Sequence, residues 1–69
     1  MLKTGFTRPD LRRLPIVIRQ TGLSAATIYR LAKSGKFPSP IKIGPRASAW
    51  LGSEVDGYIS SNIALRNGA

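Results

Sequence analysis

Two basic side chains, Arg30 and Lys33, belong to a segment whose pattern predicts a helix over residues 25–34. At about 100° per residue they lie within one arc of about 140°, opposite the apolar Ile28 and Leu31. The same arc holds Tyr29 and two small residues, Ala25 and Ala26. Such a face suits the major groove of DNA, where small residues let the backbone approach and longer basic side chains reach guanine or phosphate. An ordinary solvated helix face is the alternative interpretation.

Each residue of this face has a role in the DNA-binding interpretation. Arg30 could form a bidentate pair with guanine, and Lys33 could contact a phosphate. Ala25 and Ala26 could meet thymine methyl groups. Tyr29 could donate its hydroxyl to a phosphate, with a half-buried, structural ring as the alternative.

Catalytic chemistry has few residues to draw on. The chain contains no cysteine and no histidine, which excludes disulfides, the usual zinc sites and Cys/His nucleophiles. Its three carboxylates are Asp10, Glu54 and Asp56. Glu54 and Asp56 are two residues apart and face different ways on a helix, so they make a poor acid–base pair. We therefore expect neither an enzyme nor a cofactor nor a metal site.

The charge balance indicates a polyanionic partner. Eleven Lys and Arg against three Asp and Glu give a net charge of +8 and an isoelectric point near 11.3 in 69 residues. Nucleic acid is the usual target of so basic a domain, and an acidic membrane surface is the main competitor. No apolar run approaches the ~20 residues that span a bilayer. We expect no signal peptide and a cytoplasmic location.

The first half of the chain predicts two helices joined by a tight turn. Proline suits a first helical turn, so a first helix is expected over residues 15–20, ended by Gly22. From residue 11 onwards, apolar residues repeat at steps of three and four, as on a helix face: Leu11, Leu14, Val17 and Ile18. Ser24 can cap the second helix, and Gly35 supplies a left-handed stop. The short gap between them is typical of a helix-turn-helix.

The second half predicts a β-hairpin followed by a helix. Residues 41–43 and 47–50 alternate apolar with polar or small residues around a turn at 44–46. Ser53 can cap a last helix, in which Glu54 and Asp56 favour the helix dipole. The apolar stripe of that helix would contain Val55, Tyr58, Ile59, Asn62 and Ile63.

The predicted fold class is therefore α+β. We expect a small winged helix-turn-helix with two helices, a two-stranded hairpin wing and a C-terminal helix. A basic N-terminal arm would cover residues 1–10, the DNA-binding domain residues 11–66, and a frayed end residues 67–69.

The hairpin adds residues to the candidate site. Arg46 at the turn could enter a minor groove or clasp phosphates, and Lys42 projects from the first strand. Arg12 and Arg13 could touch the backbone beside the groove or serve solubility alone. The complete candidate set for DNA binding is Ser24, Ala25, Ala26, Thr27, Tyr29, Arg30, Lys33, Lys36, Lys42, Arg46 and Ser48.

Other residues have mainly structural interpretations. Trp50 is expected in the core, because a buried aromatic supplies more apolar contact than any aliphatic side chain. Phe37 should fill the gap between the second helix and the hairpin. Pro38 and Pro40 fix an extended entry to the hairpin. Thr27 lies near the packed side of its helix, so its hydroxyl is expected to bond back to the preceding turn.

These motifs together resemble the AlpA-like small regulators of phages and integrated elements. The resemblance covers roughly residues 14–63. It rests on Thr21-Gly22-Leu23-Ser24, Thr27-Ile28-Tyr29-Arg30-Leu31, Gly35-Lys36-Phe37-Pro38, Pro40, Ile43-Gly44-Pro45-Arg46, Trp50, Ser53-Glu54-Val55 and Ile59. The pattern is also similar to the excisionases, or recombination directionality factors, and more distantly to the MerR DNA-binding domain.

The resemblance implies a winged helix-turn-helix that binds double-stranded DNA at repeated sites, with the second helix as recognition helix. It implies two uses: an excisionase that binds and bends attachment-site DNA for a tyrosine-type integrase, or a transcriptional regulator of an integrase or phage promoter. Copies that associate on DNA would raise affinity. A rival from another class is a protein-interaction module that binds an acidic host partner.

Overall fold

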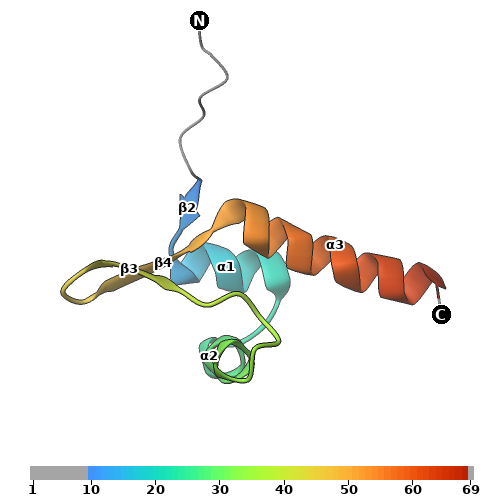
Figure 1. Cartoon of the computed structure of the whole chain (residues 1–69), viewed down its shortest axis with the longest axis horizontal. Coiled ribbons are helices and arrows are strands. Elements are labelled where there is room, and N and C mark those ends of the chain that lie inside the picture. Colours follow the sequence, from blue (N-terminus) through green and yellow to red (C-terminus); the bar gives the residue numbers. More distant parts are fainter. Residues whose placement is uncertain (1–9, 69) are drawn as a thin grey trace, which may run out of the picture.

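The domain contains three helices and a three-stranded antiparallel sheet. This confirms the predicted α+β class, and the arrangement is compatible with a small winged helix-turn-helix. The computed structural model describes residues 10–68, so residues 1–9 of the predicted arm (1–10) and the terminal residue 69 lie outside the described residues, whereas Asp10 is bonded to Arg12 and Gly52. The elements in chain order are β2 (Leu11–Arg12), α1 (Leu14–Thr21), α2 (Ala25–Lys33), β3 (Ile41–Gly44), β4 (Ala47–Leu51) and α3 (Gly52–Gly68). In Figure 1 the β3–β4 hairpin and α3 extend in opposite directions from the centre of the molecule, and α2 lies below them.

The turn between α1 and α2 follows its predicted signals. Gly22 adopts a left-handed φ of 76°, and its backbone N–H donates to the Ile18 carbonyl at 2.8 Å. The Thr21 hydroxyl donates to the Val17 carbonyl at 2.8 Å and accepts the Leu23 N–H at 3.1 Å. These bonds satisfy backbone groups that a helix end leaves unpaired. Helix α1 is one residue longer at each end than predicted.

Helix α2 begins and ends close to its predicted limits. The Ser24 hydroxyl accepts the Thr27 N–H at 3.2 Å, which is an N-cap bond. The helix ends at Lys33, one residue before the predicted end. Gly35 has a φ of 79°, and the Lys36 N–H donates to the Leu31 carbonyl at 2.8 Å. Both helices of the motif are thus closed by local hydrogen bonds, which explains why the sequence located them.

The sheet contains one strand more than the sequence predicts. Strands β3 and β4 form the expected hairpin, with Lys42 opposite Ser48. Strand β2 then adds to the other edge of β4, with Leu11 opposite Leu51. Leu11 was expected on the first helix face, and this prediction is wrong: it is a strand residue with 47% of its surface exposed. A two-residue strand has no period to detect, and its partner lies far along the chain.

The core lies where α1, α2, β4 and α3 meet. Its buried residues are Val17, Ile28, Phe37, Trp50 and Val55. Seven partly buried residues pack around it: Leu14, Ile18, Leu23, Leu31, Ala32, Tyr58 and Ile59. Trp50 is fully buried and Phe37 is 4% exposed, so both core predictions are confirmed.

The outer half of α3 leaves this core. The predicted stripe is buried at Val55 and half-buried at Tyr58 and Ile59, but Asn62 and Ile63 are exposed, contrary to the prediction. The helix continues to Gly68, past the predicted domain limit at residue 66, and its end projects away from α2 and the hairpin (Figure 1). Among residues 10–68, no helix is both long enough and apolar enough to cross a membrane.

Candidate nucleic-acid interface

The exposed face of α2 carries the side chains that the sequence assigned to it. Ala26, Tyr29, Arg30 and Lys33 are exposed and Ala25 is half-buried, whereas the opposite face is buried at Ile28. The buried face packs into the core, so the amphipathic pattern fixes which side of the helix meets solvent. The predicted division of α2 into two faces is therefore confirmed.

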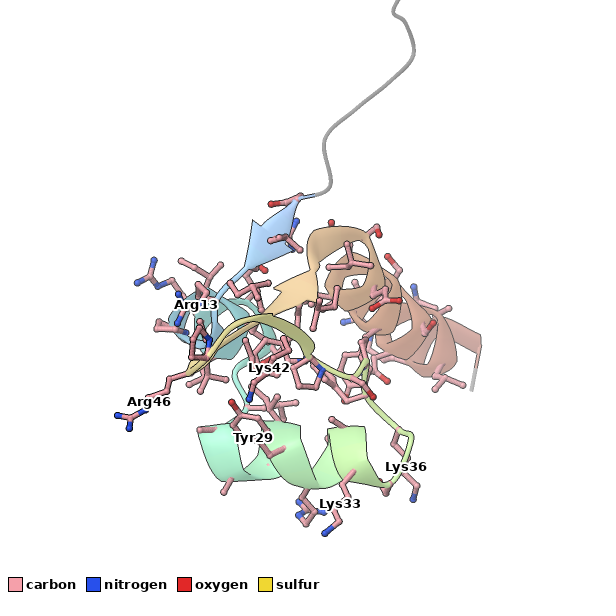
Figure 2. All side chains as sticks on the ribbon, turned by 60° about the vertical axis from the view of Figure 1, so that its left-hand side comes forward. Arg13, Tyr29, Lys33, Lys36, Lys42 and Arg46 are labelled. Atoms are coloured by element: carbon pink, nitrogen blue, oxygen red, sulfur yellow. The ribbon has the colours of Figure 1, made fainter. Side chains whose placement is uncertain are left out.

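The hairpin turns a polar face towards α2. Lys42 and Ser48 are paired across the strands, and Ser48 and Trp50 are two residues apart on β4. Residues two apart on a strand share a face, and Trp50 packs against Tyr29 of α2. The face that holds Lys42 and Ser48 is thus the one directed to α2. Figure 2 shows Lys42 pointing from the hairpin towards that helix.

Five exposed cations lie on α2, on the turn that follows it and on the hairpin, and we call them the cationic face. They are Arg30, Lys33, Lys36, Lys42 and Arg46, all exposed. Figure 2 shows Lys33 and Lys36 beside the C-terminal half of α2 and Arg46 at the tip of the hairpin. None of the five forms an ion pair with a residue that the structure describes. Their charge is therefore available to an anionic partner.

Two of the remaining candidates, Ser24 and Thr27, bond to each other. Ser24 donates its hydroxyl to the Thr27 hydroxyl at 2.9 Å, besides its cap bond to the Thr27 backbone. The structural interpretation of Thr27 is confirmed by this bond to the residue that precedes the helix. Ser48 is half-buried in the sheet. Ser24 itself is exposed at the start of α2.

An aromatic junction joins α2 to the hairpin. The rings of Tyr29 and Trp50 have centroids 5.8 Å apart and are tilted by 55°. The Trp50 indole N–H donates to the Pro38 carbonyl at 2.9 Å. A second pair, Phe37 and Tyr58, meets edge to face at 4.7 Å on the α3 side. Tyr29 remains 46% exposed, so its ring is half-buried while it also faces solvent.

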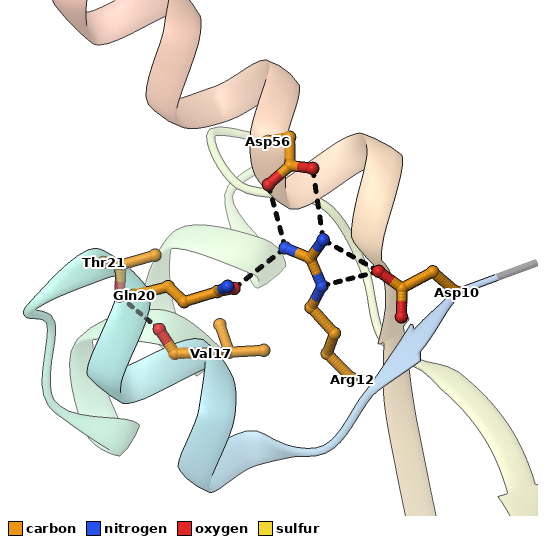
Figure 3. Close-up of polar contacts among 6 residues, drawn as sticks. All are labelled: Asp10, Arg12, Val17, Gln20, Thr21 and Asp56. Atoms are coloured by element: carbon orange, nitrogen blue, oxygen red, sulfur yellow. Dashed lines mark hydrogen bonds and ion pairs between the residues drawn. The ribbon is translucent and has the colours of Figure 1, made fainter.

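Arg12 has neither of the two roles considered for it. Its guanidinium donates to Asp56 at 2.8 and 3.1 Å, to Asp10 at 2.9 Å and to Gln20 at 2.8 Å (Figure 3). Only 16% of its side chain is exposed. These bonds link β2, α1 and α3, so Arg12 stabilises the fold rather than serving as a free surface charge. The hydrogen bonds from Arg12 hold the pKa of Asp56 below its usual range.

One sequence signal pointed to part of this cluster. Asp10 and Arg12 are two residues apart, which places them on one face of an extended segment. The Asp10 carbonyl also accepts the Gly52 N–H at 2.6 Å, which ties Asp10 to the start of α3. The link to Asp56 had no such signal, because it joins residues far apart in the chain. Arg13, by contrast, is exposed and lies on the same side of Figure 2 as Arg46.

Comparison with known proteins identifies the family. Residues 10–63 match the family described as "Prophage CP4-57 regulatory protein (AlpA)". The chain belongs to this AlpA family. The match extends from the Asp10–Arg12–Asp56 cluster across α2 and the hairpin, so it includes every candidate site residue. The AlpA-like resemblance seen in the sequence is thereby confirmed.

Two relatives of this AlpA-family chain come from a phage and a bacterium. A protein of Enterobacteria phage P4, named "Uncharacterized protein ORF88", is 40% identical over 61 residues, covering 88% of this chain and 69% of the relative. The "DNA-binding transcriptional activator AlpA" of Escherichia coli (strain K12) is 32% identical over 59 residues, covering 77% of this chain and 84% of that protein. Both alignments extend over most of this AlpA-family chain, so the similarity is not confined to one motif.

Proposed function

We propose that this chain is a sequence-specific DNA-binding regulator of a phage or integrated element. The observation that carries the proposal is the cationic face: five exposed cations on α2, on the turn after it and on the hairpin, without carboxylate partners among the described residues. The net charge of +8 adds a general attraction to a polyanion. The E. coli relative is named a DNA-binding protein, which supports the same conclusion. The proposal assigns no catalytic step to the chain.

In this proposal α2 enters the major groove and the hairpin acts as a wing beside it. Arg30 pairs with guanine, and Ala25 and Ala26 allow close approach and meet thymine methyl groups. Lys33 contacts a phosphate, and the Tyr29 hydroxyl donates to another.

The wing and the helix ends supply the remaining contacts. Arg46 lies over the adjacent minor groove or its phosphates, and Lys42 and Lys36 meet the backbone. Ser24 and Thr27 at the start of α2, with Ser48 in the wing, complete the set. Release of counterions by these cations provides much of the affinity, so binding should weaken steeply with salt.

The finer role that we favour is control of transcription at an integrase or phage promoter. The relative of known activity is named a transcriptional activator, and the two proteins align over most of their lengths. Such a protein would work in the bacterial cytoplasm, on the nucleoid.

A second role is that of an excisionase, which binds and bends attachment-site DNA for a tyrosine-type integrase. It would require several copies side by side, because one small domain covers little DNA. The exposed Ile63 on the projecting end of α3 supports a contact between neighbouring copies, since 47% of it is exposed. Contact with integrase is part of this second role.

The test is a titration of the purified protein onto two labelled duplexes, the attachment-site fragment and the integrase promoter. Fluorescence anisotropy at two salt concentrations, with random DNA as competitor, gives the affinity, and gel shifts show the number of complexes. Competitor-resistant binding at the promoter alone supports the transcriptional role. A ladder of complexes on the attachment site supports the excisionase role.

Failure to bind any duplex, even at low salt, would contradict the proposed function. That result would favour the alternative hypothesis, in which the chain is a protein-interaction module that binds an acidic host partner. Arg66→Ala is a matched control: it removes the same charge as a change at Arg30 or Arg46, but from the exposed end of α3, which points away from α2 and the wing (Figure 1). Its binding should remain close to that of the unchanged protein.

A further inference from the structure

Tyr29 joins the two parts of the candidate interface. Its ring lies 5.8 Å from that of Trp50, centroid to centroid, across the junction between α2 and the wing. Ile28 of α2 adds a second link, because it belongs with Trp50 to one buried core cluster. Trp50 is fully buried, whereas Tyr29 is 46% exposed, so Tyr29 can be changed without opening the centre of the core.

A hydrogen bond and the pairing of its strand fix the orientation of Trp50. Its indole N–H is bonded to the Pro38 carbonyl at 2.9 Å, in the segment by which the chain enters the wing. Its strand β4 is the central strand of the sheet, paired on both edges. The orientation of Trp50 is therefore set by the sheet, and whatever packs on Trp50 takes its orientation from the wing.

The segment between α2 and the wing is anchored at two points: the buried ring of Phe37 and the Pro38 carbonyl, which accepts the Trp50 indole N–H. Residues 34–40 form neither helix nor strand. Lys42 and Ser48 share the strand face of Trp50, and Arg30 and Lys33 share the exposed face of α2 with Tyr29. A change in the angle between α2 and the wing would therefore move these two groups of side chains relative to each other.

We propose that Tyr29 is a positioning residue whose ring holds the wing at a fixed angle to α2, so that both can contact DNA at once. The inference rests on the proposed function and deepens it, because it assigns to one aromatic pair a share of the coupling between the two contacts, beside the core contact of Ile28. Two linked contacts bind more tightly when their separation already matches the target. A favourable aromatic pair changes an equilibrium constant by up to about tenfold, which is enough to bias this geometry.

The first test uses the free protein and needs no DNA. Hydrogen exchange of the β3 and β4 amides is compared among the unchanged chain, Tyr29→Phe and Tyr29→Ala. Tyr29→Phe keeps the ring and should exchange like the unchanged chain. Tyr29→Ala should exchange several-fold faster in the wing while the amides of α3 keep their protection. Equal protection of the wing in all three proteins would overturn the inference.

The second test is a double-mutant cycle on DNA that the protein binds. If the ring positions the wing, Arg46→Ala should weaken binding about tenfold in the unchanged chain but less than about threefold in Tyr29→Ala, because the wing is already misplaced. Arg30 lies on α2 itself and does not depend on the wing, so the cycle of Tyr29→Ala with Arg30→Ala should be additive within about twofold.

The outcomes separate the inference from the proposed function. Additive effects of Tyr29→Ala and Arg46→Ala would overturn the positioning role while DNA binding stands. An equal loss of binding in Tyr29→Phe and Tyr29→Ala would also overturn it, because the hydroxyl alone would then carry the effect. If the unchanged protein binds no DNA, the proposed function fails, and hydrogen exchange still decides whether Tyr29 orders the wing.

Discussion

The guanidinium of Arg12 contacts both carboxylate oxygens of Asp56, with donor–acceptor distances of 2.8 and 3.1 Å. This bidentate pair connects β2 to the first turns of α3, two elements that are far apart in the sequence. Bidentate arginine–carboxylate pairs are among the stronger ionic contacts in proteins. Arg12 also bonds Asp10 and Gln20, so its removal would leave three partners without their donor.

Replacing Arg12 should destabilise the fold without removing a DNA contact. Arg12→Met keeps an unbranched stem like that of arginine but loses every bond to Asp10, Gln20 and Asp56. The melting temperature should therefore fall. Arg13→Met is the matched control, since Arg13 is exposed and forms no ion pair with a described residue. Thermal unfolding followed by circular dichroism measures both. Equal melting temperatures for the two variants would contradict the role given to Arg12.

The same pair predicts how stability depends on pH. The pKa of Asp56 is lower in the folded than in the unfolded chain, because Arg12 donates hydrogen bonds to its charged form. Its stabilising effect is therefore present above the unfolded pKa of about 3.9 and is lost as the pH falls through the lower, folded pKa. Urea unfolding at pH 7, 4 and 3 should show this loss. In Asp56→Asn the free energy of unfolding should fall less between pH 4 and pH 3 than in the unchanged protein. An equal fall in both proteins would disprove the role given to the Arg12–Asp56 pair.

Trp50 should be the side chain on which folding depends most. It is fully buried, packs on Tyr29 and donates to the Pro38 carbonyl. Trp50→Ala should cost about 3–5 kcal/mol, which is enough to unfold a small domain of marginal stability. Trp50→Phe should be less harmful, since it keeps an aromatic ring and loses the indole hydrogen bond. Chemical denaturation followed by circular dichroism tests this order, and a fully stable Trp50→Ala variant would refute it.

Two glycines should respond to the same substitution with opposite signs. Gly22 has a φ of 76°, and Gly22→Ala should destabilise by about 1–2 kcal/mol through backbone strain alone, since the space around it is open. Gly57 lies inside α3 with equally open space and no positive φ. Gly57→Ala should therefore stabilise by about 1 kcal/mol, because alanine is the better helix former. Urea unfolding of the two variants gives the signs, and a stabilised Gly22→Ala protein would rule out the left-handed cap.

Arg30 should matter for DNA recognition and not for folding. Arg30→Ala should reduce specific DNA affinity by about 1–3 kcal/mol and leave the melting temperature unchanged, because the side chain is exposed. The comparison with Arg66→Ala, which removes the same charge from the end of α3, separates a specific contact from a general loss of charge. Anisotropy titrations provide the affinities. Unchanged affinity in Arg30→Ala would show that α2 has been wrongly assigned as the recognition helix.

Local signals account for the parts of the fold that the sequence predicted well. The limits of α2 follow from a capping serine and a left-handed glycine, and the burial of Ile28 follows from helical periodicity. The burial of Trp50 follows from its size and apolar character. Such features depend on neighbouring residues, so one chain without relatives is enough to find them.

The parts that were missed depend on contacts between distant segments. Strand β2 exists because Leu11 and Arg12 pair with β4, and two residues carry no strand period of their own. The ion pair of Arg12 with Asp56 depends on the same docking. In α3, Ile63 continues the apolar stripe in sequence but is exposed, because it borders an open hollow beside Gln20 and Thr21 of α1 and not the packed core. The candidate site was predictable to the extent that it lies on α2 and the hairpin, whereas its junction at Tyr29 and Trp50 required the three-dimensional structure.

The most direct test of the central claim is a map of backbone amide shifts by NMR while a bound duplex is added to isotopically labelled protein. The expected result is a set of shift changes concentrated on α2 and on the wing, including the amides of Arg30, Lys42 and Arg46, with little change at the end of α3. Changes centred on α3, with α2 and the wing unaffected, would contradict the proposed interface.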